Sequence, residues 1–296
     1  MTAIDTTGRD TATTEPPTPE AARGRRPGWR YVPLILGALL FLFPFYYMVL
    51  GSLQAKSDST VGGLFPHNLT LKNYSQINAS VHLARTLLNS AIFTAGVIAC
   101  TLVFGLLAGY ALARLQFRGR GLMFVAMLLL QVVPFQLLMI PLYVLIVRNY
   151  GFGDSFIGMI APFAINSTAV FVFRQYFLQL PIELFEAAHI DGAGEVRTLI
   201  TVALPLVRPA ILTVVLMTFI GPWNEFLWPF LITKQQHMQP LAVSLSNYIT
   251  TAAATANNPV AAILAGACVL AAPAVVLFIV FQRKFVTSDL GSGVKG

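Results

Sequence analysis

Six long apolar runs divide the chain, with short polar segments between them. The runs cover residues 31–53, 89–113, 122–147, 155–178, 209–232 and 260–282. Because an α-helix rises about 1.5 Å per residue, each run is long enough to cross a hydrocarbon layer of about 30 Å. The pattern predicts an all-α, polytopic membrane protein with six transmembrane helices. Prolines inside several runs are compatible with this, since neighbouring helices can satisfy the freed backbone groups.

The two ends of the chain lack this apolar pattern. Residues 1–30 are rich in Thr, Pro and charged side chains, so they are predicted to form a disordered cytoplasmic tail. The apolar run behind them is too long for the core of a secretory signal, and we expect it to remain as a span. Residues 31–285 would form one transmembrane domain, and residues 286–296 would form a polar, cytoplasmic C-terminal tail.

The composition agrees with a membrane protein, because 56% of the residues are hydrophobic, 10% are charged and the mean hydropathy is +0.71. The net charge of +7 does not indicate nucleic-acid binding, since the basic residues gather at the ends of the apolar runs. Fourteen of the 19 lysines and arginines fall on one side of the predicted spans. Basic loops stay in the cytoplasm, so both termini are predicted to be cytoplasmic and residues 54–88 to face outward.

The segment between the fourth and fifth spans is unusually charged for this chain. Five charged residues lie within fifteen positions: Glu183, Glu186, Asp191, Glu195 and Arg197. Pro181 suits the first turn of a helix, and acids favour the positive end of the helix dipole. The sequence Asp-Gly-Ala-Gly then ends this helix, with Gly192 or Gly194 free to adopt a left-handed conformation.

A second short helix is predicted over residues 195–203, with one apolar stripe and with Pro205 at its end. The stripe consists of Val196, Leu199, Ile200 and Ala203. About thirty residues connect the two spans, where a few would be enough. We therefore expect a helix–turn–helix at the cytoplasmic membrane surface that docks another protein, with the small Ala187 and Ala188 permitting close approach.

Three polar residues in or near the spans are candidates for a translocation path or gate: Asn224, Glu225 and Gln131. Intramembrane ionisable groups usually face the protein interior or a solute path. The alternative for Glu225 is a structural pairing beside an interfacial belt of Trp223 and Trp228, and for Gln131 it is a helix–helix hydrogen bond. No catalytic set and no metal-ligand spacing occur, so neither catalytic residues nor a metal site is predicted.

The charged segment also carries a four-part pattern. Glu186-Ala187-Ala188 is followed after three residues by Gly192, and after nine more by Val202-Ala203-Leu204-Pro205. The pattern resembles the EAA loop of permease subunits in ABC importers, which usually has Ile where Val202 stands. The resemblance implies that one set of residues couples this chain to an ATPase: Glu186, Ala187, Ala188, Asp191, Gly192, Ala193, Leu204 and Pro205.

Two further stretches, residues 221–232 and 89–120, resemble sugar-importing permeases of the same family. The C-terminal end is similar to that of the maltose-type second permease subunit, with Ser292 where those tails have alanine. The resemblance covers nearly the whole chain from residue 31. It implies a type I ABC importer permease fold with a cytoplasmic coupling helix, in the plasma (inner) membrane of a bacterium.

The resemblance also implies partners: a second, homologous permease subunit in a heterodimer, two ATPase subunits, an extracytoplasmic sugar-binding protein and membrane lipid. The chain has no P-loop, because none of its five lysines follows a glycine. ATP and Mg would therefore be bound by the ATPase subunits, and this chain would be a non-catalytic subunit with no cofactor. The expected solute is a di- or oligosaccharide, with glycerol phosphate or amino sugars as alternatives.

Two other classes of protein are weighed against this interpretation. A secondary, ion-coupled transporter without an ATPase partner typically has paired charges at mid-membrane and often an internal repeat. An intramembrane enzyme needs a nucleophile with a base, or a metal-ligand cluster, within its spans. The apolar runs contain neither arrangement.

Overall fold

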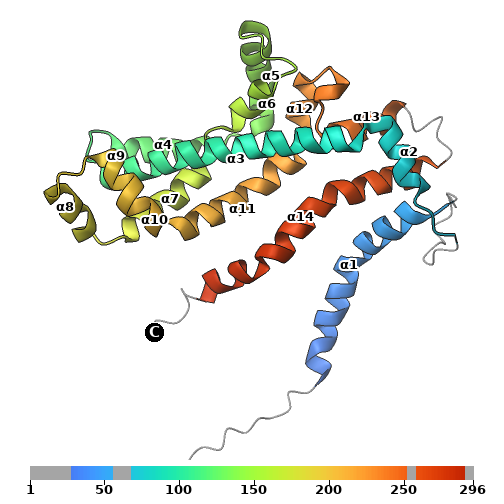
Figure 1. Cartoon of the computed structure of the whole chain (residues 1–296), viewed down its shortest axis with the longest axis horizontal. Coiled ribbons are helices and arrows are strands. Elements are labelled where there is room, and N and C mark those ends of the chain that lie inside the picture. Colours follow the sequence, from blue (N-terminus) through green and yellow to red (C-terminus); the bar gives the residue numbers. More distant parts are fainter. Residues whose placement is uncertain (1–27, 56–67, 252–257, 291–296) are drawn as a thin grey trace, which may run out of the picture. The chain divides into compact units, whose positions relative to one another are not determined.

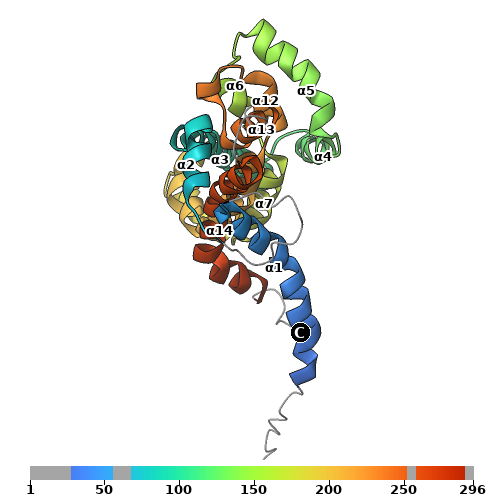
Figure 2. The same ribbon diagram turned by 90° about the vertical axis from the view of Figure 1, so that its right-hand side faces the viewer.

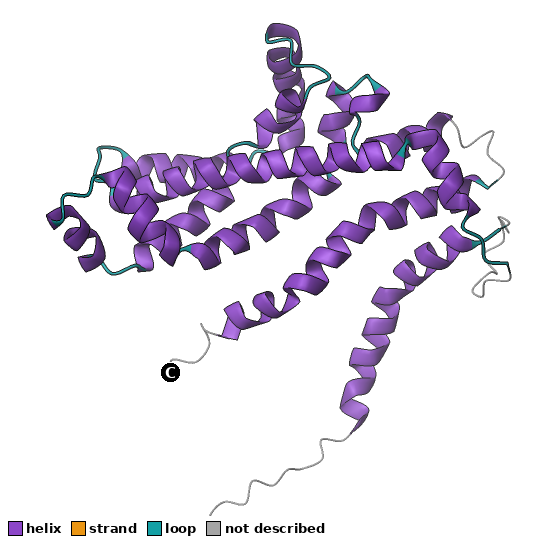
Figure 3. Ribbon diagram, viewed as in Figure 1, coloured by secondary structure: helices purple, strands orange, loops and turns teal. Residues whose placement is uncertain are grey.

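The computed structural model describes residues 28–55, 68–251 and 258–290, and of residues 283–290 it describes the backbone alone. Most of the predicted N-terminal tail and residues 291–296 of the predicted C-terminal tail therefore lie outside the described residues. The described part consists of helices and loops, apart from an isolated backbone bridge between Gln54 and Leu69 (Figure 3). The α-helices are α1 Val32–Leu53, α2 Lys72–Val81, α3 Leu83–Arg114, α4 Arg120–Leu130, α5 Phe135–Tyr143, α6 Phe156–Ile160, α7 Ser167–Gln179, α8 Glu183–Ile190, α9 Glu195–Thr198, α10 Leu204–Leu206, α11 Arg208–Asn224, α12 Leu227–Ile232, α13 Leu241–Thr251 and α14 Pro259–Leu290.

The chain divides into two units, residues 1–45 and residues 46–296. The described part of the first unit is a 3₁₀ turn, Gly28–Tyr31, and the beginning of α1. Its large apolar side chains are exposed, and Phe41 is 78% accessible. Such a helix has no core of its own, so its surface suits contact with lipid or with another membrane helix.

Three helices are long and apolar enough to cross a membrane, namely α1, α3 and the Pro259–Gln282 part of α14. Three bent pairs pass the same test together, which gives up to six spans if each pair is one span. The bends are 94° between α4 and the stretch Phe135–Asn149, 52° between Phe156–Phe163 and α7, and 79° between Glu195–Leu206 and α11. Figure 2 shows α5 turning away from α4. Pro134 stands at this break, where it can neither donate a backbone hydrogen bond nor follow a helical residue easily.

Helix α3 has 32 residues, as many as α14, and packs closely on α7. A side chain at Gly109 would place its Cβ 2.7 Å from the Cβ of Phe173 and 3.1 Å from the backbone nitrogen of Arg174. Gly105, one turn earlier, faces the Phe173 ring and Ala169. Small residues four apart allow two membrane helices to approach closely, which explains this contact.

The two ends of α3 contact different sets of helices (Figure 1). At its C-terminal end, here called the Arg114 end, Tyr110 and Ala113 share a hydrophobic cluster with residues of α7, α8 and α11. At its N-terminal end, here called the Leu83 end, Leu83 and Leu87 pack on a cluster formed by α2, α13 and α14. The 32 residues of α3 span about 48 Å, which exceeds the hydrocarbon thickness of about 30 Å. In a bilayer, α3 therefore tilts or extends beyond the hydrocarbon region.

Candidate functional site

The charged segment forms two short helices joined by a tight turn. The amide of Gly192 donates to the carbonyl of His189, and the amide of Ala193 donates to that of Ala188. This pair of bonds, with Gly192 at φ +76°, is the Schellman arrangement that ends many helices. Of the two glycines predicted to cap α8, Gly192 has the left-handed conformation, whereas Gly194 has φ −75°. Asp191 stands at the C-cap, directly before this turn.

Helix α8 has one buried face and one exposed face. Phe185 and Ala188 are buried, and Phe185 belongs to the hydrophobic cluster at the Arg114 end of α3. Glu186 and Ala187 are exposed, and Ile190 is 86% accessible. The two neighbouring alanines therefore lie on different faces of α8, since Ala188 packs inward and only Ala187 is accessible to a partner.

The predicted second helix differs from the expected single stripe. Leu199 and Ala203 are buried as expected, but Val196 and Ile200 are exposed. The four residues therefore do not share one buried stripe, and the segment Leu199–Ala203 is a π-helical turn, which departs from the regular α-helical period. Leu204 and Pro205 then lie in α10, which ends at Leu206 before the 79° bend into α11.

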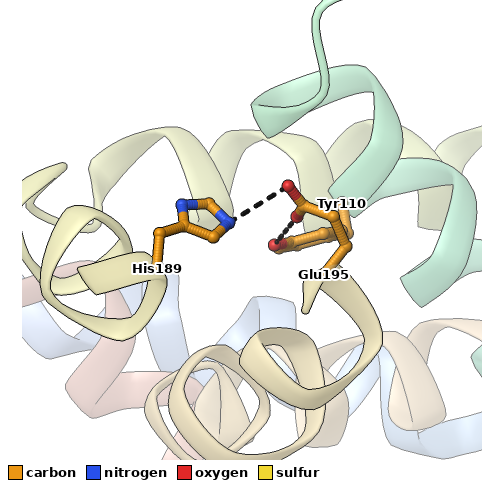
Figure 4. Close-up of polar contacts among 3 residues, drawn as sticks. All are labelled: Tyr110, His189 and Glu195. Atoms are coloured by element: carbon orange, nitrogen blue, oxygen red, sulfur yellow. Dashed lines mark hydrogen bonds and ion pairs between the residues drawn. The ribbon is translucent and has the colours of Figure 1, made fainter. Parts of the chain in front are cut away.

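A polar cluster joins α8 and α9 to the Arg114 end of α3 (Figure 4). The hydroxyl of Tyr110 donates to Oε2 of Glu195 at 2.8 Å, and Nε2 of His189 lies 3.2 Å from Oε1 of the same carboxylate. Glu195 therefore receives one contact from the long helix and one from α8. The side chains of His189 and Glu195 are each 48% accessible, so water shares this carboxylate.

Arg114 makes a second connection next to this cluster. Its guanidinium donates to the carbonyls of Phe177 and Leu180 at the end of α7, and its Cζ lies 4.1 Å from the ring centroid of Phe185. A guanidinium can bind carbonyls at its edge while its face contacts an aromatic ring. Arg114 therefore ties α3, the end of α7 and α8 together.

A cavity of about 340 Å³ lies beside these contacts and is lined by Arg114, Arg120, Glu186, His189 and Glu195, among others. Of these residues, Glu186 is predicted to couple to an ATPase and Glu195 belongs to the charged segment, whereas the sequence predicts no role for Tyr110, Arg114 or His189. Glu195 lies 85 residues from Tyr110 in the chain. In the sequence, the only indication of these contacts is weak: a basic residue ends one predicted span, and acidic residues lie in a later loop.

The residues proposed for a translocation path fall into two places. Gln131 lies at the bend after α4, where its Oε1 accepts a hydrogen bond from the hydroxyl of Thr168 at 3.4 Å. Glu225 accepts from the amide of Trp228 at 3.2 Å, so it caps the start of α12. Asn224 is exposed and donates to the carbonyl of Ile220. No hydrogen bond in the described part of the chain joins Gln131 to Asn224 or Glu225.

The two tryptophans near Glu225 do not form the expected interfacial belt. Trp223 is 5% accessible and its indole donates to the carbonyl of Leu270, while Trp228 is fully buried and donates to that of Gly158. Both indoles find their hydrogen-bond partners inside the protein. For Trp228 this follows from the break at Glu225, after which α12 enters the core cluster that contains this side chain.

The described residues form a multi-pass helical arrangement in which the short, half-exposed helix α8 lies at one end of the long helix α3. Residues 101–285 match the family described as binding-protein-dependent transport system inner membrane component, and the chain belongs to this family. The predicted resemblance is therefore confirmed, and the alternative of an ion-coupled secondary transporter is not supported. Permeases of this family work with a binding protein, an ATPase and a further permease, and are typically non-catalytic.

Several curated relatives are similar over nearly their whole length. The arabinooligosaccharides transport system permease protein AraQ of Bacillus subtilis is 32% identical over 88% of this chain and 92% of its own length. The sn-glycerol-3-phosphate transport system permease protein UgpE of Yersinia pestis is 33% identical over 86% of this chain and 93% of its own.

A solved structure supports the fold. A chain from the crystal structure of a bacterial ABC transporter involved in the import of the acidic polysaccharide alginate has a TM-score of 0.75 and 24% sequence identity to this chain. The likeness covers 86% of this chain and 94% of the solved one. The predicted fold class, an all-helical ABC importer permease, is confirmed.

Proposed function

We propose that this chain is the permease subunit of a carbohydrate importer and that α8, with the turn after it, receives the movement of an ATPase subunit. The observation that carries the proposal is the division of α8 into a face anchored by Phe185 and a face exposed around Ala187 and Ile190. An anchored helix moves as a rigid body when its free face is pushed. The carbohydrate class is supported by the relatives named for arabinooligosaccharide and sn-glycerol-3-phosphate transport.

The force would reach the spans through two connections. Phe185 and Arg114 link α8 to α3 and the end of α7, and Glu195 links α9 to Tyr110 of α3. Of the residues predicted to couple, Glu186 and Ala187 would contact the ATPase. Asp191, Gly192 and Ala193 would fix the turn after α8. Leu204 and Pro205 would transmit the motion into α11. Ala188 would act from the buried face.

The proposed assembly contains a second, homologous permease subunit, two ATPase subunits and an extracytoplasmic sugar-binding protein in a bacterial inner membrane. ATP and Mg would be held by the ATPase subunits, so this chain would perform no catalysis. The Arg114 end of α3 and both termini would face the cytoplasm, which is supported by the excess of basic residues on that side. The Leu83 end would then face outward.

A solute path is proposed beside Gln131. Its partner Thr168 lines a cavity of about 200 Å³ between α7 and α11, together with Asn166 and Thr218. Hydroxyl and amide groups in an otherwise apolar bundle suit contact with sugar hydroxyls. Asn224 and Glu225 have only local backbone contacts, and their path or gate role stays a prediction.

Cysteine cross-linking in the assembled importer tests the docking role. In a variant without Cys100 and Cys268, Ala187→Cys is expected to cross-link to an ATPase subunit through a short thiol reagent. Ser75→Cys on α2, which is also exposed but lies at the Leu83 end, is the matched control and should not cross-link. Failure of Ala187→Cys to reach the ATPase, or equal cross-linking of both variants, would contradict the proposal.

A further inference from the structure

An open cavity of about 830 Å³ lies at the Leu83 end of α3, between the α2–α3 corner and the 3₁₀ turn Gln236–Met238. We call it the corner pocket. Its polar lining comes from Asn78, His82, Arg85, Gln235, Gln236 and His237. Such a concentration of polar side chains is notable in a chain that is 56% hydrophobic.

The walls of the corner pocket are held by hydrogen bonds to backbone carbonyls. His82 adopts φ 53°, and its amide donates to the carbonyl of Asn78, which fixes the corner between α2 and α3. Asn89, which is 2% accessible, donates to the carbonyls of His237 and Gln239. The side-chain Nε2 of Gln236 donates to the backbone carbonyl of Ser80 and so joins the two walls. The side chains thus project from a backbone that is already ordered, which lowers the entropy lost on binding.

The charge of the corner pocket is not neutralised within the described part of the chain. The guanidinium of Arg85 and the rings of His82 and His237 form no ion pair or hydrogen bond there, and the ion pair that is present joins His189 to Glu195 at the other end of α3. A guanidinium binds carboxylate or phosphate oxygens in a bidentate manner. The neighbouring side-chain amide of Gln235 can bind hydroxyl groups as donor and acceptor, and that of Asn78 can donate through Nδ2, while its Oδ1 accepts from the amide of Leu83.

We propose that the corner pocket binds a sugar that carries a carboxylate or a phosphate, with the oxyanion on Arg85 and the hydroxyls on the amide side chains. The cavity volume falls in the range of about 300–1,000 Å³ that is typical of small-molecule sites. A concave pocket of this size favours a compact solute over an extended protein surface. The inference rests on the proposed function only for the class of solute, a carbohydrate.

Saturation-transfer NMR on the full chain in lipid nanodiscs, without ATP, ATPase or binding protein, tests the proposal. The probes are glucuronate and glucose 6-phosphate, with glucose as the neutral counterpart. Both anionic sugars are expected to bind at least about fivefold more tightly than glucose, which corresponds to about 1 kcal/mol. Arg85→Gln should remove this preference. Arg148→Gln, the same change at an exposed arginine outside the corner pocket, should retain it.

Equal binding of glucose and glucuronate by the unaltered chain would overturn the proposal, as would a preference that survives Arg85→Gln. A second measurement identifies the other occupant, an acidic surface of the binding protein. If Arg85→Gln leaves the sugar signals unchanged but weakens association of the binding protein in a salt-dependent manner, the corner pocket is a protein-docking site and the solute proposal is wrong. Because no ATPase is present in the NMR experiment, its failure is distinguishable from a failure of α8 to couple.

Discussion

An arginine and a histidine lie close together at both the Arg114 end and the Leu83 end of α3, but their side chains have different partners. At the Arg114 end, Arg114 binds two carbonyls and the Phe185 ring, and His189 pairs with Glu195. At the Leu83 end, Arg85 and His82 form no such contacts within the described part of the chain and line an open cavity.

This difference indicates that charged side chains have a different role at each end of the same helix. A cation that is bonded within the protein holds helices together and transmits their motion, because breaking its contacts exposes unsatisfied groups. A cation at a cavity wall without such contacts is available to a ligand of opposite charge. The comparison predicts that changes at the Arg114 end affect coupling and leave ligand binding at the corner pocket unaltered, and that changes at the Leu83 end do the opposite.

The largest effect is expected where α3 itself is damaged, since both ends depend on it. Gly109→Leu would force a side chain against Phe173 and the backbone of Arg174, at distances that no rotamer relieves. Overpacking costs about 1–3 kcal/mol and occasionally more, so we expect a clear loss of folded protein. The yield of monodisperse protein in detergent and its thermal unfolding temperature measure this.

Gly221→Leu is the matched control for Gly109→Leu. A Cβ at Gly221 in α11 meets nothing within 4 Å, so the yield and unfolding temperature of this variant should stay near those of the unaltered chain. Similar losses in both variants would show that apolar bulk in a span is harmful by itself and that the α3–α7 contact has no special importance.

The helical spans and the turn at Gly192 illustrate what the sequence can predict, and the contacts of α3 with later residues illustrate what it cannot. The apolar runs predict the helical membrane fold, because span length follows from bilayer thickness. The preference for glycine just after a helix end limits the predicted cap of α8 to two positions, Gly192 and Gly194. The π-helical turn at Leu199–Ala203 and the bond between Tyr110 and Glu195 were not predicted. A local pattern does not indicate which of the many later residues a side chain on α3 will meet, since that depends on packing of the whole bundle.

The next effect concerns the turn that fixes α8. Gly192→Val places a β-branched residue at φ +76°, which costs roughly 1–2 kcal/mol. We expect transport-coupled ATP hydrolysis in proteoliposomes to fall by about tenfold, because a cost of about 1.4 kcal/mol corresponds to a factor of ten. Sugar binding at the corner pocket should be unchanged, which would sharpen the distinction between the two ends.

Gly194→Val serves as the control, since Gly194 has φ −75° and a side chain there meets nothing within 4 Å. It should retain most of the coupled hydrolysis. If Gly194→Val lowers coupling as strongly as Gly192→Val, the loss comes from crowding at a partner surface and the left-handed turn is not its cause.

A smaller effect is expected from the polar link between α3 and α9. Tyr110→Phe removes the hydrogen bond to Glu195, and a bond to a charged group contributes about 1.5–3 kcal/mol when it is shielded from water. Glu195 is half exposed, so we expect only about 1 kcal/mol, or about a fivefold loss of coupled hydrolysis. In a double-mutant cycle, Tyr110→Phe should add little to the loss already caused by Glu195→Ala, which removes the acceptor. Additive losses would show that the two residues act separately.

The smallest effect is expected for the ion pair of His189 with Glu195. Both side chains are 48% accessible, and exposed ion pairs contribute about 0–1 kcal/mol because water and salt screen them. His189→Gln should therefore change coupled hydrolysis by less than about twofold, and raising the salt concentration should reduce the difference further. The critical measurement is which of the two changes, Tyr110→Phe or His189→Gln, causes the larger loss of coupled hydrolysis. If His189→Gln impairs coupling more than Tyr110→Phe does, then α8 is held mainly through its own histidine, and the long helix α3 is not the element that receives the motion through Glu195.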